Sequence, residues 1–225
     1  MKLNTAEKFL VLAHHPEKGR FMVNGTHLRY GIAGALLLEM SLENIISLQD
    51  NRLVYRSAGT TSDELISELT AVIRQSEKAR KVGTWINKFA RRSGRYKWTL
   101  LRRLSDKRII RIESKKFLGL IPYKMSYITS HSIRTELIRT ARNNVLFHEG
   151  LTNENIVVLG LIEACRMHKL LSNDREELKR IRKDLKEIIK ASPIAGAVSE
   201  TIKQVEAAII AAVIASSTAA SASSN

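Results

Sequence analysis

Residues 28–42 read LRYGIAGALLLEMSL, and the fold expected for the whole chain follows from this segment. It predicts a helix that is apolar on nearly every side, and such a helix belongs at the centre of a bundle. Small residues at 31 and 33–35 leave room for a neighbouring helix to approach closely. The segment Ile156–Ala164 is apolar in the same way. We therefore expect Gly31–Leu42 and Ile156–Ala164 to lie buried side by side.

The remaining sequence predicts more helices and two short hairpins. Only three prolines and eleven glycines occur in 225 residues, which favours long helices over a sheet with many turns. Helices are expected from an N-cap at Thr5 to Ala13, from Thr61 or Ser62 through Ile73, and over Thr84–Arg91, Lys97–Asp106, Ser132–Phe147, Asn153–Leu171, Asp174–Lys190 and the stretch after Pro193–Gly196. Hairpins are expected from Ile45–Leu48 with Leu53–Tyr55, and from Ile109–Glu113 with Phe117–Tyr127 around a turn at Ser114–Lys116.

These elements add up to a mostly α fold. We expect a single domain over residues 1–215, a central helical bundle ringed by amphipathic helices and carrying one or two short β-hairpins. No linker long enough to divide two domains interrupts it. Residues 216–225 are Ser/Ala-rich and are expected to form a disordered tail.

The positive charge is unevenly distributed. The formal net charge is +15, and the segment Lys78–Lys116 holds 15 Lys or Arg against two acids, Asp106 and Glu113. Elsewhere, as in the helix from Asp174, acids interleave with the bases and offer helix-spaced pairs. Almost no acids are available to pair with the cations of the basic block, so the block predicts a polyanionic partner, either nucleic acid or a phospholipid surface.

Catalytic and metal-binding patterns do not emerge from the sequence. His14-His15 is an adjacent pair without metal-ligand spacing, and His131, His148 and His168 are scattered. Cys165 lies in an apolar segment and is interpreted as a small core residue. We therefore expect a binding protein rather than an enzyme, with no cofactor and no metal. The N-terminus lacks the apolar run of a signal peptide, and no apolar stretch reaches membrane-spanning length, so a cytoplasmic location is expected.

Several segments together resemble the Golgi phosphoprotein 3 family. Glu7-Lys8-Phe9-Leu10-Val11-Leu12-Ala13 is similar to its N-terminal segment, and residues 28–42 resemble its first long core helix. Thr60–Leu69 looks like its Thr-Gly-Asp-x-Leu-Leu-Asp-Glu-Ala-Leu element, and Trp85-Ile86 matches a Trp-Ile pair. Leu100–Phe117 resembles its Leu-x-x-Lys-Gly-Val-Leu element, and residues 207–212 its apolar terminal helix. The resemblance covers about residues 5–215.

The resemblance implies peripheral membrane binding through phosphatidylinositol 4-phosphate, at the Golgi if the source is a eukaryote. The family's head-group pocket uses a tryptophan, an in-helix arginine and an arginine pair. These positions fall near Asn24, at Ala33, and at Gly94 and Lys97, so that only Lys97 matches in charge. The candidate head-group residues are therefore Arg20, Arg29, Arg91, Arg95 and Lys97. Further partners that the resemblance suggests are cytosolic tails of membrane proteins and a second copy of the chain.

A second candidate site is the apolar stretch Phe21-Met22-Val23 just before the core helix. It predicts either a short strand packed on the bundle or a wedge that inserts into lipid. The rival function is nucleic-acid binding by residues 97–127, which have the outline of a winged helix. In that interpretation Arg102 and Arg103 lie on the recognition helix and Lys115-Lys116 at the wing tip.

Overall fold

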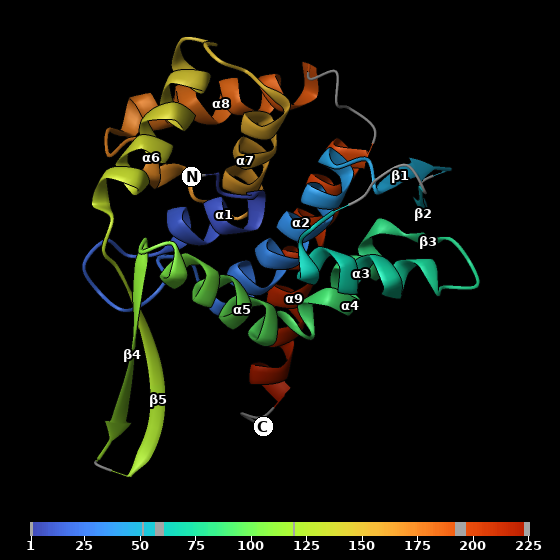
Figure 1. The fold of residues 1–225 in the computed structure, drawn as a ribbon. Coiled ribbons are helices and arrows are strands. Elements are labelled where there is room, and N and C mark those ends of the chain that lie inside the picture. The colour runs from blue at the N-terminus through green and yellow to red at the C-terminus, as the bar shows by residue number, and fades with distance from the viewer. Residues whose placement is uncertain (1, 51, 57–60, 119, 192–196, 223–225) are drawn as a thin grey trace.

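The computed structural model of the chain is organised around one long helix, α2, Gly25–Leu42 (Figure 1). The structure describes residues 2–50, 52–56, 61–118, 120–191 and 197–222, with the side chains of 197–198 and of 213–222 excepted. The other described helices are α1 Thr5–Ala13, α3 Glu64–Arg74, α4 Val82–Ala90, α5 Ser93–Asp106, α6 His131–Leu146, α7 Asn153–Ala164, the 3-10 helix η1 His168–Leu170, α8 Arg175–Ala191 and α9 Ala197–Ala222. The strands are β1 Ile46–Gln49, β2 Arg52–Tyr55, β3 Arg80–Lys81, β4 Ile110–Phe117 and β5 Ile121–Ile128. The expected mostly α, single-domain fold is confirmed.

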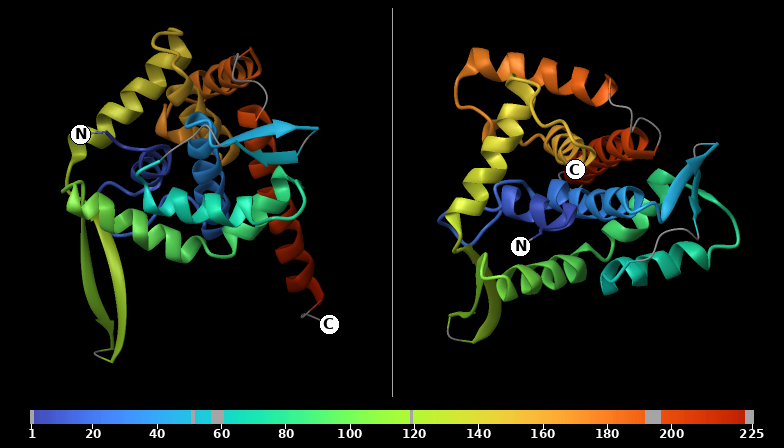
Figure 2. Two further views of the ribbon diagram at one scale, coloured as in Figure 1. Left: turned by 45° about the vertical axis from the view of Figure 1, so that its right-hand side comes forward. Right: turned by 45° about the horizontal axis from the view of Figure 1, so that its top comes forward.

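The helices α2 and α7 lie at the centre, as the sequence predicts. α2 contacts α1, α4, α5, α7 and α9. Every residue from Tyr30 to Leu38 is buried, and in α7 every residue from Ile156 to Ile162 is buried. The amphipathic helices α3, α6 and α8 lie further out (Figure 2). The expectation that the two apolar helices pack together in the core is therefore confirmed.

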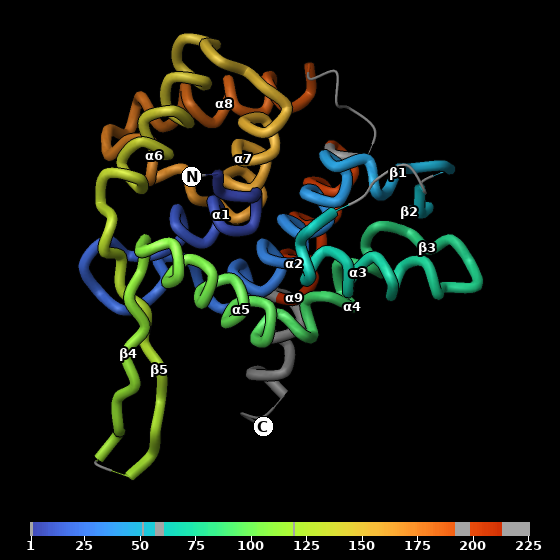
Figure 3. The backbone as a smooth tube through the Cα atoms, viewed as in Figure 1, coloured from blue at the N-terminus to red at the C-terminus, as the bar shows by residue number. Residues whose placement is uncertain are grey.

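Glycines allow α9 to lie close against two central helices. Figure 3 shows α2 and α9 running side by side. A Cβ atom added to Gly34 of α2 would overlap Val205 of α9, and one added to Gly160 of α7 would overlap Ile202. A β-carbon at either glycine would thus force α9 away from its neighbours.

Helix starts are set by side chains one or two residues away from the expected positions. Asn4, rather than Thr5, caps α1, because its Oδ1 atom accepts from the Glu7 amide at 2.8 Å while the Glu7 carboxylate accepts from the Asn4 amide at 3.0 Å. This reciprocal pair satisfies two backbone donors that a helix leaves free. Asp63, rather than Thr61 or Ser62, caps α3 by accepting from the Leu65 and Ile66 amides.

Three expected boundaries differ in the structure. The second hairpin does not turn at Ser114–Lys116, because these residues pair with Lys124, Tyr123 and Pro122 in the β4–β5 ladder. The helix expected over Asn153–Leu171 ends at Ala164, where Arg166 adopts a left-handed backbone conformation and Met167 bonds back to Ile162. The expected tail is helical as far as Ala222, and its disorder stays a prediction.

The first hairpin has a third strand. β1 pairs antiparallel with β2, and β2 pairs with the two-residue strand β3 through Arg52–Lys81 and Leu53–Arg80. The segment that follows α3 is thereby fixed against the hairpin before the chain enters α4.

Candidate membrane-binding surface

The second hairpin ends in a set of exposed apolar side chains. β4 and β5 project together from the helical body in Figure 1, beyond the end of α5. Four side chains at the far end have large exposed fractions: Phe117 59%, Leu118 81%, Leu120 83% and Ile121 63%. We refer to these four residues as the apolar tip. Leaving this much apolar surface in water is unfavourable, which indicates an interaction site.

Lysines stand directly behind the apolar tip. Lys115 and Lys116 on β4 and Lys124 on β5 are all exposed. The Lys115 ammonium donates to the Tyr127 hydroxyl at 2.7 Å and lies 3.4 Å from the Glu113 carboxylate. The hydrogen bond to Tyr127 and the charge of Glu113 raise the pKa of Lys115, so this lysine stays charged at neutral pH. The far half of the hairpin therefore combines an apolar end with a cationic stem.

The base of the hairpin is fixed in the core and against the loop at 14–24. Ile110 and Ile128 are buried, and the buried His14 ring forms a 2.9 Å hydrogen bond to the Ser126 hydroxyl of β5. Burial lowers the pKa of His14, so its ring is neutral at pH 7. A side chain at Gly19 would overlap Met125 and Tyr127. The loop and the hairpin base consequently form one packed unit.

This loop contains the expected wedge, Phe21-Met22-Val23. The Phe21 ring packs on the His14 ring with centroids 4.9 Å apart, and both Phe21 and Val23 lie half-buried against the core. Met22 is 45% exposed, and its sulfur accepts from the Arg134 guanidinium at 3.5 Å. Only one of the three side chains therefore points substantially into solvent, which fits the packed-strand alternative better than the wedge.

The candidate head-group residues occupy several environments. Arg29 is exposed and stacks on the Tyr30 ring at 5.2 Å. Tyr30 donates to Asn87 of α4 at 3.2 Å, which places the first turns of α2 beside α4. Arg91, at the exposed end of α4, has no ion pair with any acid in the described part of the chain. Arg20 is exposed in the loop beside the hairpin base.

The remaining two candidate head-group residues, Arg95 and Lys97, are less available to a lipid head group. Arg95 makes a bidentate pair with Glu68 of α3, with N–O distances of 2.8 and 2.6 Å. Lys97 is half-buried with its ammonium 5.1 Å from the Trp98 ring, and burial lowers its pKa. The basic block therefore does find acidic partners, but they come from outside it.

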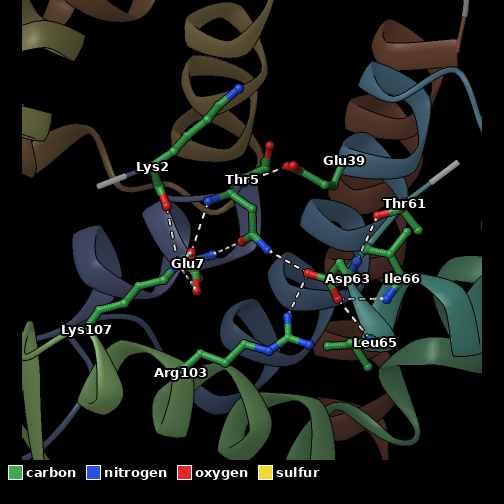
Figure 4. A network of polar contacts seen from close by, with 11 residues as sticks. Lys2, Thr5, Glu7, Glu39, Thr61, Asp63, Leu65, Ile66, Arg103 and Lys107 are labelled. Carbon is green, nitrogen blue, oxygen red and sulfur yellow. Dashed lines mark hydrogen bonds and ion pairs between the residues drawn. The ribbon is translucent and has the colours of Figure 1, made fainter. Parts of the chain in front are cut away.

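Two more cations, one in α5 and one just after it, are also paired with acids from outside the basic block (Figure 4). Arg103 donates to Asp63 at 2.7 Å, and Lys107 donates to both carboxylate oxygens of the buried Glu7 at 2.7 and 2.6 Å. The expectation that the block lacks acidic partners is thus wrong at Arg95, Arg103 and Lys107. These acids are far from α5 in sequence, so the composition of the basic block does not reveal them.

The positions that depart from the resembled family have structural roles. Asn24 caps α2 by accepting from the His27 amide at 2.9 Å. Ala33 is fully buried, so its side chain cannot reach a head group. Gly94 is exposed in the first turn of α5, and a β-carbon added there would meet nothing within 4 Å.

Within the residues that the structure describes, no group of three or more His, Cys, Asp or Glu could hold a metal ion. His15 accepts from the Glu17 and Lys18 amides and shapes the loop. Burial raises the pKa of the Cys165 thiol far above its ordinary range, which makes it a poor nucleophile. No helix in the described part of the chain is long and apolar enough to cross a membrane.

A scan against protein families matches residues 6–205 to the family described as Golgi phosphoprotein 3 (GPP34). The chain belongs to the Golgi phosphoprotein 3 family. The match spans the elements from α1 into α9 and includes the second hairpin. A search of curated proteins finds none that matches the chain significantly. Membership confirms the resemblance drawn from the sequence and does not by itself assign a ligand.

Sequence reasoning missed the apolar tip. The signal was present, because Phe117, Leu118, Leu120 and Ile121 flank a glycine and lie between two stretches that contain lysines. The expected turn at Ser114–Lys116 placed Phe117 and the residues after it inside a strand. In the structure the ladder continues to the pair Phe117–Ile121, so the four residues lie at the exposed end of the hairpin.

Proposed function

We propose that this member of the Golgi phosphoprotein 3 family is a peripheral membrane protein that binds anionic phospholipid, phosphatidylinositol 4-phosphate or a related phosphoinositide. The observation that carries the proposal is the apolar tip with lysines directly behind it. A bilayer offers hydrocarbon to the tip and anionic head groups to the stem, in that order of depth. Arg20, Arg29 and Arg91 are exposed and would add contacts to the lipid surface.

The energetics favour reversible docking. Moving a large apolar side chain fully out of water is worth about 1.5–3 kcal/mol, so even partial insertion of the four tip residues contributes several kcal/mol. Each lysine near an anionic leaflet adds about 1 kcal/mol. The summed binding free energy is enough for reversible attachment and is far smaller than that of a membrane-spanning helix.

The apolar tip also separates this proposal from nucleic-acid binding. In a winged helix, the wing would present Lys115 and Lys116 at its end. Here the end carries Phe117, Leu118 and Leu120, which have no counterpart to contact on a phosphodiester backbone. Arg103, one of the two expected recognition-helix cations, is already paired with Asp63. The nucleic-acid alternative has less support for these two reasons.

The decisive experiment is flotation with liposomes. The variant Leu118→Ser/Leu120→Ser should lose binding to phosphoinositide liposomes. The loss should be greatest at high salt, because a Debye length of about 3 Å at 1 M removes most of the electrostatic contribution of the lysines. Both side chains are more than four-fifths exposed, so the fold should be unaffected. Phe147→Ser, at a 64% exposed position after α6, is the matched control and should bind normally. Unchanged binding by the tip variant would refute the proposal.

A second set of liposomes is needed to determine which lipid head group the protein prefers. Liposomes of equal charge made with phosphatidylserine, phosphatidylinositol 4-phosphate or other phosphoinositides should be compared, with DNA as a competitor. Arg29→Gln/Arg91→Gln should weaken phosphoinositide binding more than phosphatidylserine binding, because guanidinium groups bind phosphate in a bidentate manner. Strong competition by DNA would favour the alternative function. Golgi location, cytosolic tails as partners and self-association remain proposals that rest on family membership.

A further inference from the structure

A second basic region lies in a cleft that is separate from the apolar tip and from the five candidate head-group residues. The cleft has a volume of about 690 Å³ and lies between the end of α3, the segment leading into β3, α4 and the start of α5. Four cations line it: Lys78, Arg80, Lys88 and Arg92. Its volume is within the range of about 300–1,000 Å³ that is usual for ligand sites.

The cations of this cleft are not neutralised by the protein. All four are exposed, and none makes an ion pair with an acid among the residues whose placement is defined. The lining contains one acid, Glu77. This contrasts with three cations in or just after α5, whose charges are already paired with Glu68, Asp63 and Glu7: Arg95, Arg103 and Lys107. The cleft therefore has an excess positive charge that an anion can use.

Local contacts hold the lining in place. The Ser76 hydroxyl donates to the Lys78 carbonyl at 2.9 Å and accepts from the Arg80 guanidinium at 3.2 Å. The Ala79 carbonyl accepts from Arg52 of β2 at 2.9 Å, while Leu53 and Arg80 pair across the β2–β3 ladder. These contacts fix the segment without using the charge of Lys78.

The other wall is equally fixed. On α4, the Lys88 ammonium lies 5.0 Å from the ring of the buried Trp85, which holds its aliphatic stem against the helix. Arg92 is the N-cap residue of α5, and no side chain caps that end, so the positive end of the helix dipole adds to its charge. The cations thus converge from separate elements on one concavity.

The composition of the lining restricts the ligand. Val72 is the sole apolar residue in the described lining. The described lining contains no aromatic ring on which a nucleobase could stack. Four cations match more than one phosphate group. We propose that this cleft binds a small compound with several phosphate groups, either as a free molecule or as the head group of a lipid.

The test is calorimetric titration of the full chain with inositol trisphosphate and inositol hexakisphosphate. Lys78→Gln/Arg92→Gln should weaken both affinities by at least about tenfold, because two charge-assisted contacts are lost. Neither side chain makes a hydrogen bond or an ion pair with the described residues, so the fold should be kept, and circular dichroism would confirm folding. The control is Lys183→Gln/Lys190→Gln, which removes two exposed charges from α8 on another part of the molecule. The control should bind as tightly as the unaltered chain.

Liposomes with phosphatidylinositol bisphosphate form the second arm and identify the source of the ligand. Loss of binding by the Gln variant on these liposomes, with weak binding of the free compounds, would assign the cleft to a lipid head group. No saturable binding in either arm, equal weakening in the control, or tighter binding of a short single-stranded DNA would each overturn the proposal. The tip variant Leu118→Ser/Leu120→Ser should still bind free inositol phosphates, so this inference and the proposed function can fail separately.

Discussion

Val205 of α9 packs directly over Gly34 of α2, so that the two helices approach to a distance that any β-carbon at Gly34 would prevent. Gly34 and Val205 are both buried in the core. The contact explains why the central helix α2 carries a glycine in its middle despite the cost in helix propensity. Close packing requires a small residue at position 34, because the backbone of Gly34 has an ordinary helical conformation that other residues could adopt.

The first prediction concerns this contact. Gly34→Ala should lower the free energy of unfolding by about 1–3 kcal/mol, because overpacking outweighs the gain in helix propensity. Urea unfolding measures the change. Gly94→Ala on α5 is the control, since nothing lies within 4 Å of a new methyl group there, and it should be neutral or stabilising by up to about 1 kcal/mol. If Val205→Ala does not restore stability to the Gly34→Ala variant, the contact is not the cause.

The second prediction concerns the buried ion pair between Glu7 and Lys107. Glu7 is 1% exposed, and Lys107 donates to both of its carboxylate oxygens. Lys107→Ala should destabilise the fold by about 1–3 kcal/mol, because a buried carboxylate would lose its counter-charge. Lys116→Ala removes an equal charge from the exposed hairpin and should change stability by less than about 0.5 kcal/mol. Similar effects of the two substitutions in urea unfolding would contradict this account.

The third prediction is a dependence of stability on pH. Burial acts to raise the pKa of the Asp63 carboxyl, but the hydrogen bond and charge of Arg103 and the Leu65 and Ile66 amides outweigh burial and set the pKa below its ordinary value. The folded state therefore holds this proton less tightly than the unfolded state. The resulting stabilisation is complete above the unfolded pKa of about 3.9 and is lost as the pH falls through the lower folded value.

Asp63→Asn should remove this contribution. The amide oxygen can still cap α3, but the charge opposite Arg103 is gone, so the variant should lose stability at pH 7 and approach the unaltered chain at low pH. Asp106→Asn changes the net charge equally at an exposed position at the end of α5. Thermal unfolding across acidic pH compares the two. A constant stability difference between Asp63→Asn and the unaltered chain would rule out the linkage.

The fourth prediction separates the two interpretations of residues 21–23. Phe21→Ala should destabilise the chain by about 2 kcal/mol, because its ring packs on buried His14. Met22→Ala should have little effect on stability, since 45% of this side chain is exposed. Liposome flotation in high salt then tests insertion with the folded Met22 variant. Clear loss of salt-resistant binding by Met22→Ala alone would restore the wedge interpretation.

The composition of the core follows from local sequence. Residues 28–42 and 156–164 are apolar on nearly all faces, and such helices can be stable only when neighbours cover them, so their central position follows from hydrophobic periodicity. The family membership also follows from local segments, because their order along the chain is a property of sequence. Cap positions such as Asn4 and Asp63 were within one or two residues of the expected ones.

Which charged and apolar side chains are available for binding depends on the tertiary structure. Glu68 pairs with Arg95 across 27 positions and Glu7 with Lys107 across 100, and no local pattern reveals such pairs. The register of β4 with β5 placed the four residues of the apolar tip at the exposed end of the hairpin. Lys78 and Lys88 share a cleft only because β3 pairs with β2 beside α4. Each of these outcomes depends on distant segments meeting in space, which the periodicity of a single segment does not encode.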